Sequence, residues 1–187
     1  MKIPWRQLPI IIVCCTSCVS TDLPAPKLVE ISVSRKVDDV RLSETVTGTV
    51  RGEWIEATTT FRRFLPEDRK RHEHWLGTDG GYPGYVVSSM TVTRGGKAIV
   101  VPHYIYSDFG DFAFQGGFLR ILQLESGFAV KHYGSDGAGS FDATFYFDEK
   151  GFDRVVINGG HGGGQHIRRP EAEQVETQQP LSAALLP

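Results

Sequence analysis

Apolar and polar residues alternate in one segment after another between Leu28 and about Asn158. The clearest segment is 141–147, in which every second residue is apolar: Phe141, Ala143, Phe145 and Phe147. Segments 29–34, 55–62 and 86–93 show related alternation. Because successive side chains of a β-strand point to opposite faces, this period of two predicts strands that each bury one face.

Short glycine-containing turns separate these segments. The sequences Arg94-Gly95-Gly96-Lys97, Glu125-Ser126-Gly127 and 148–151 each stand between two apolar runs, which is typical of β-hairpins. Three hairpins in series predict an antiparallel meander. Pro102 cannot donate to a ladder, so it predicts a sheet edge or a bulge. Residues 66–75 are the best candidate for a short helix, because Pro66 is followed by acids.

The fold class that follows is all-β, a single antiparallel β-sandwich over residues 28–158, with a β-barrel as the alternative. The long connection between Pro66 and Tyr85 favours the sandwich, because it could cross from one sheet to the other. Residues 19–187 contain no cysteine, so no internal disulfide supports this domain and a hydrophobic core must stabilise it.

The two ends of the chain differ from the domain in composition. Residues 159–166 are mostly glycine, and residues 168–187 are rich in Glu, Gln and Pro. We therefore expect 159–187 to be a flexible, disordered C-terminal tail. Residues 18–27 contain Pro24, Pro26 and small polar residues, which predicts a tether in front of the domain.

The first 17 residues have the composition of a signal peptide. Lys2 and Arg6 precede an apolar run from Leu8 to Cys15, and Thr16 and Ser17 follow it. This run is much shorter than the roughly 20 residues that a membrane-spanning helix needs, which argues against an uncleaved anchor.

All three cysteines of the chain, Cys14, Cys15 and Cys18, lie at the end of this run. The segment Cys15-Thr16-Ser17-Cys18 resembles the lipobox of bacterial lipoproteins, in which an invariant Cys follows small residues. The resemblance implies that Cys18 carries fatty acids such as palmitate, becomes the first residue of the mature protein and attaches it to a membrane of the cell envelope. Cys15 stands where this family usually has Leu.

The same resemblance favours one of the two envelope membranes. In lipoproteins, an Asp directly after the acylated Cys tends to retain the protein at the inner membrane. Val19 stands at that position, which favours the outer membrane and a domain in the periplasm or at the surface.

Two other interpretations of the cysteines remain open. Simple cleavage after Ser17 would release a soluble secreted protein. Cys15 and Cys18 could also form a redox or metal pair, but the βαβ context and the further ligands that such pairs need are missing nearby.

The charge balance argues against a nucleic-acid partner. The chain has 20 Lys and Arg against 22 Asp and Glu. Cleavage before Cys18 would remove Lys2 and Arg6 and no acid, leaving 18 basic residues, so the formal net charge would change from −2 to −4. Nucleic-acid-binding domains usually carry a clear basic excess.

The sequence contains no complete catalytic or cofactor motif. Asp108-Phe109-Gly110 lacks the other kinase elements, and the glycine loop after Asn158 lacks the Lys-Ser/Thr of a phosphate-binding loop. His161 and His166, even with His72 and His74, are not held on an evident scaffold, so we expect no metal and no cofactor. The basic run 62–71 is interleaved with acids, which predicts a solvated mixed-charge surface.

Four acids in the second half of the domain are the candidate ligand-binding residues: Asp108, Asp111, Asp136 and Asp142. Two of them with an aromatic side chain in one cleft could hydrolyse a glycosidic bond. Without such convergence, the chain is expected to be a non-enzymatic lipoprotein domain that binds an envelope protein, a polysaccharide or a small ligand. The alternative is a small secreted or surface hydrolase that acts on carbohydrate.

Overall fold

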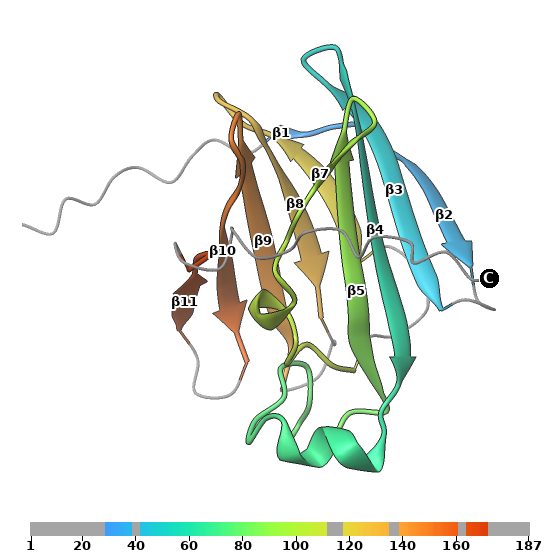
Figure 1. Cartoon of the computed structure of the whole chain (residues 1–187), viewed down its shortest axis with the longest axis vertical. Coiled ribbons are helices and arrows are strands. Elements are labelled where there is room, and N and C mark those ends of the chain that lie inside the picture. Colours follow the sequence, from blue (N-terminus) through green and yellow to red (C-terminus); the bar gives the residue numbers. More distant parts are fainter. Residues whose placement is uncertain (1–28, 39–41, 112–117, 135–138, 161–163, 172–187) are drawn as a thin grey trace, which may run out of the picture.

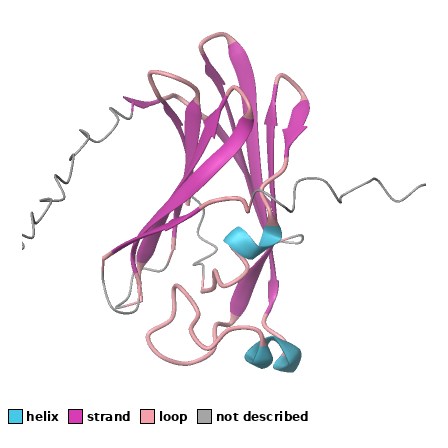
Figure 2. Cartoon of the chain, turned by 60° about the vertical axis from the view of Figure 1, so that its left-hand side comes forward, coloured by secondary structure: helices cyan, strands magenta, loops and turns pink. Residues whose placement is uncertain are grey.

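Two antiparallel β-sheets pack face to face in the structure, a computed structural model that describes residues 29–38, 42–111, 118–134, 139–160 and 164–171 (Figures 1 and 2). The sheets are separate and do not close into a barrel, so the predicted sandwich is confirmed. Cys18 and Asp136 lie outside the described residues.

Each sheet is a meander of neighbouring hairpins. The five-stranded sheet consists, in spatial order, of β2 (Ser34–Asp38), β3 (Ser43–Val50), β4 (Glu53–Arg63), β5 (Tyr85–Arg94) and β6 (Lys97–Ile99). The six-stranded sheet consists of β1 (Val29–Glu30), β7 (Leu119–Gln123), β8 (Phe128–Tyr133), β9 (Phe141–Asp148), β10 (Gly151–Gly159) and β11 (Gln165–Arg168). Within each sheet, and apart from β1, strands that follow one another in the chain are adjacent, because short turns join most of them.

The three predicted hairpins are confirmed as β5–β6, β7–β8 and β9–β10. Gly95 and Gly96 both have positive φ, 56° and 79°, as a tight primed turn requires. Strand β6 is the outermost strand of its sheet and ends three residues before Pro102, in agreement with the predicted edge.

The core lies between the sheets and is rich in phenylalanine. Phe141 and Phe147 on β9 point inward as the alternation predicts, whereas Asp142 between them does not. The rings of Phe128 and Phe147 stack at 4.7 Å with an interplanar angle of 8°, and the ring of Phe109 meets that of Phe141 at 4.9 Å. These contacts join β8 and β9 to the loop that precedes β7.

The predicted crossover between Pro66 and Tyr85 is wrong. This segment, which includes the short 3-10 helix η1 (Pro66–Lys70), connects β4 with β5, which are adjacent in one sheet. It folds back because the N–H of Phe64 donates to the carbonyl of Gly84 at 3.0 Å. The chain changes sheet instead at residues 31–33 and between β6 and β7.

Part of the segment predicted as a tail is a strand. Residues Gln165–Arg168 form β11 and pair with Val155–Asn158 of β10. This segment is polar in composition, but its backbone pairing with β10 and the ion pair of Arg168 with Asp108 hold it in the sheet. The sandwich therefore extends beyond Asn158. Residues 172–187 lie outside the described residues.

No helix among the described residues is long and apolar enough to cross a membrane.

Candidate functional site

Asp108 lies in the loop after the 3-10 helix η2 (His103–Ile105) and is bound by Arg168 of β11. The guanidinium donates to both carboxylate oxygens, at 2.6 and 2.7 Å, and also to the carbonyl of Ile105 at 2.8 Å. Such two-pronged pairs are stronger and more directional than single hydrogen bonds. Asp108 therefore holds β11 against the loop.

Asp111 closes the connection between β4 and β5. Its carboxylate accepts the N–H of Gly84 at 2.6 Å, and its own N–H donates to the carbonyl of Tyr85 at 3.0 Å. Its φ is 45°, in the left-handed region that Asp tolerates better than most residues. These contacts give Asp111 a role in shaping a turn.

Asp142 projects from the outer face of β9. It forms an ion pair with Lys131 of β8 at 3.4 Å and accepts a hydrogen bond from the side-chain amide of Asn158 on β10 at 3.0 Å. Arg168 pairs in register with the core-facing Val155, so it lies on the inner side of the sheet with Asp108. Asp108 and Asp142 thus lie on opposite faces of the six-stranded sheet and cannot share one substrate.

The ion pair of Asp108 predicts a local effect that can be measured. Asp108→Asn should accelerate amide hydrogen exchange in β11 at least tenfold, because β11 is an edge strand of four residues paired only with β10. Exchange mass spectrometry of peptides spanning 164–169 checks this. Asp153→Asn, which removes the carboxylate that pairs with the exposed side chain of Arg169, is the control and should leave β11 protected. Equal acceleration in both variants would contradict the proposed role of Asp108.

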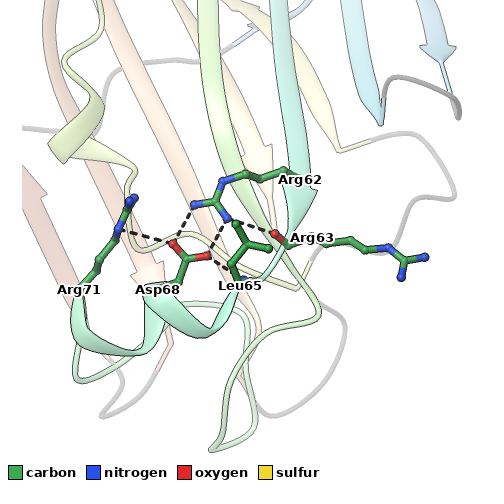
Figure 3. Close-up of polar contacts among 5 residues, drawn as sticks. All are labelled: Arg62, Arg63, Leu65, Asp68 and Arg71. Atoms are coloured by element: carbon green, nitrogen blue, oxygen red, sulfur yellow. Dashed lines mark hydrogen bonds and ion pairs between the residues drawn. The ribbon is translucent and has the colours of Figure 1, made fainter.

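The charged run 62–71 is not simply a solvated surface, because Asp68 is fully buried within it. Arg62 donates two hydrogen bonds to Asp68, at 2.6 and 2.8 Å, and the N–H of Leu65 donates a third at 2.9 Å (Figure 3). Arg71 approaches from the other side, with its Nε 3.5 Å from the carboxylate (Figure 3). Sequence reasoning missed this cluster; Pro66 followed by an acid two residues later was the available signal.

The donors around Asp68 lower the pKa of its carboxyl to about 2, with the hydrogen bonds of Arg62 as the largest cause. A buried carboxylate that already accepts bonds from Arg62 and Leu65 is not available to a substrate. The cluster instead fixes η1 to the end of β4.

Two further ionisable residues lie inside the sandwich. His132 on β8 is 1% exposed, and its ring lies 6.2 Å from the rings of both Phe61 and Phe109. Burial lowers its pKa to about 3. Glu44 on β3 is also buried and accepts the N–H groups of Phe118 at 3.2 Å and Leu119 at 3.5 Å, where the chain enters β7. Both residues face inward and contribute no accessible site.

An open groove of about 670 Å³ lies at the edge of the sandwich, where β6 of one sheet faces the start of β10 of the other. Its lining comes from both sheets and from the end of the described chain: Arg94, Lys97, Ala98, Ile99, Val100, Pro102, His103, Tyr104, Lys150, Gly151, Phe152, Pro170 and Glu171. The volume is in the range typical of small-molecule sites, about 300–1,000 Å³. Of the predicted acids that the structure describes, Asp108, Asp111 and Asp142, none lines this groove.

The three Lys and Arg side chains of the groove differ in their partners. Arg94 donates to the carbonyls of Asp148 and Glu149, at 2.9 and 3.0 Å, and so ties the two sheets together. Lys97 and Lys150 are exposed, and neither ammonium group forms an ion pair within the described part of the chain. These two lysines are therefore available to an anion.

The described residues contain no group of three His, Cys, Asp or Glu side chains placed to hold a metal ion. Two of the histidines that the sequence offers as metal ligands lie in different parts of the fold. His72 packs edge-to-face on Trp75 at 4.9 Å, and His166 is exposed on β11. His161 lies outside the described residues.

In comparisons with known proteins, no family model, no curated protein and no solved structure matches this chain.

Proposed function

We propose that the chain is a membrane-anchored lipoprotein of the cell envelope, acylated at Cys18, whose β-sandwich is a non-enzymatic binding domain. The lipobox-like segment supports the anchor, and Val19 favours the outer membrane. The first strand begins at Val29, so residues 19–28 would separate the lipid from the folded domain. The groove at the sandwich edge supports a binding role and is the observation that carries it.

The alternative of a carbohydrate hydrolase has weaker support. Glycoside hydrolysis needs two carboxyl groups on either side of one scissile bond, roughly 5 to 10 Å apart. Asp108 is held by Arg168, Asp111 by the N–H of Gly84, and Asp142 by Lys131 and Asn158. A hydrolase would have to break these contacts or use other acids.

The anchor is tested by metabolic labelling with a clickable fatty acid. We expect label on the wild-type protein and none on Cys18→Ser, because the acylated sulfur is then absent. Cys14→Ser is the matched control and should remain labelled, since residue 14 leaves with the signal peptide. Membrane fractionation of the labelled protein should place it in the outer membrane.

The opposite result is also informative. A wild-type protein that takes up no label, and whose mature mass corresponds to cleavage after Ser17, would disprove the anchor. The domain would then be a soluble secreted protein, and glycosidase assays on purified protein would become the next experiment.

A further inference from the structure

Apolar side chains form one part of the lining of the groove at the edge of the sandwich. Ile99, Val100 and Pro102 contribute from the segment that leaves β6, Tyr104 from η2, and Phe152 from β10. Val100, which directly follows the edge strand β6, is 68% exposed and leaves apolar surface open to a ligand.

Basic side chains, which we call the rim, form another part of the lining. Lys97 begins β6 and Lys150 lies in the β9–β10 turn, so the two ammonium groups come from different sheets. Among the described residues, the lining contains one carboxylate, that of Glu171. The backbone N–H of Glu171 donates to the hydroxyl of Tyr104 at 2.8 Å. The described part of the lining therefore has three basic side chains, Lys97, Lys150 and the engaged Arg94, against one acid, which is a positive excess.

We propose that this groove binds a single-chain amphiphile with an anionic head group. The apolar chain would lie over Val100 and Phe152, and the head group would lie between Lys97 and Lys150. We infer an anionic head group because the rim is positively charged. We infer a ligand with one chain, taken up from solution, because the volume of the groove is modest. The inference deepens the proposed binding role and does not depend on acylation of Cys18.

The test is a fluorescence titration with 11-(dansylamino)undecanoate, using its methyl ester as the neutral counterpart. The full chain carries Cys18→Ser, so that it has no acyl chain of its own, and is purified without detergent. We expect saturable binding of one carboxylate probe per chain and at least tenfold weaker binding of the ester. Among alkyl carboxylates competing with the probe, each added CH₂ should tighten binding about threefold to fourfold until the groove is filled.

Charge reversal at the rim gives the sharpest comparison. Lys97→Glu with Lys150→Glu should weaken binding of the carboxylate at least tenfold. Lys36→Glu with Lys70→Glu makes the same change in net charge away from the groove, on the opposite edge strand β2 and in η1, and should bind like the parent chain. Val100→Asn removes apolar surface at an exposed position and should weaken binding about threefold without affecting folding.

Four binding results would each overturn the proposal: no saturable binding by the parent chain, equal binding of ester and carboxylate, equal losses in the two charge-reversal variants, or unchanged binding by Val100→Asn. If the rim variants instead change self-association in sedimentation experiments, a second copy of the chain covers the groove and the proposal is wrong. A negative result in this binding test would not affect the labelling result at Cys18. The proposed ligand of the groove and the proposed acylation of Cys18 can therefore be tested separately.

Discussion

Asp68→Ala is expected to lower the free energy of unfolding by about 3 kcal/mol at neutral pH. The substitution removes the carboxylate that accepts two hydrogen bonds from Arg62 and one from the N–H of Leu65. Removing one partner of a buried ion pair costs about 3–5 kcal/mol, and we take the lower end because Arg62 is one-third exposed. Urea denaturation of the wild type and the variant measures the difference.

The pH dependence of this difference follows from the lowered pKa of Asp68. The folded pKa, about 2, lies below the usual value of 3.8, so the folded state favours the ionised carboxylate. The contribution of Asp68 is therefore complete above about pH 4 and is lost as the pH falls toward 2. The difference in the free energy of unfolding between the wild type and Asp68→Ala should therefore become smaller as the pH falls from 4 to 2.

Glu67→Ala is the matched control, because Glu67 is the neighbouring acid on the same turn and is exposed. It should change the free energy of unfolding by no more than about 0.5 kcal/mol. If Asp68→Ala is no more damaging than Glu67→Ala, the buried pair does not stabilise the fold and the account of η1 is wrong.

His132 is expected to make the sandwich sensitive to acid. Its folded pKa, about 3, lies below the usual 6.5 because the ring is buried between Phe61 and Phe109. The unfolded chain takes up the proton below pH 6.5 and the folded chain does not, so folding becomes less favourable as the pH falls from 6.5 to 3. The slope is about 1.4 kcal/mol per pH unit, and the loss over the whole window is on the order of 5 kcal/mol.

His132→Leu should remove this slope while keeping an inward-facing side chain of similar size. His166→Leu, at an exposed position of β11, should keep the slope of the wild type. The measurement is the free energy of unfolding in urea at intervals between pH 7 and pH 4. A wild-type stability that stays constant over this range, or an unchanged slope in His132→Leu, would contradict the prediction.

The strands and their turns could be predicted because their signals are local. In β9, Phe141, Phe145 and Phe147 face the core because alternate side chains share a face. Gly95 and Gly96 specify a tight turn through their positive φ. These features depend on a few consecutive residues, so a single sequence is enough to find them.

The candidate site could not be predicted in the same way. The sequence shows four acids that could supply a carboxylate pair but not the distances between them, and Asp108 and Asp142 lie on opposite faces of one sheet. The groove brings together Lys97, Val100 and Lys150 from two hairpins, and no local pattern indicates which hairpins face each other. Both lysines flank glycine turns, which is the only sequence signal that we find for them.

The sequence by itself determined the fold class, the positions of most strands, the three hairpins and the lipobox-like segment, because alternation, turn chemistry and short motifs act over a few residues. Only the tertiary structure decided where the chain changes sheet, how Arg168 fixes β11 to Asp108 across 60 residues, and how Arg62 buries Asp68. These depend on packing and on ion pairs between separate elements. Such contacts stabilise the protein only when the folded chain brings together residues that are far apart in the sequence.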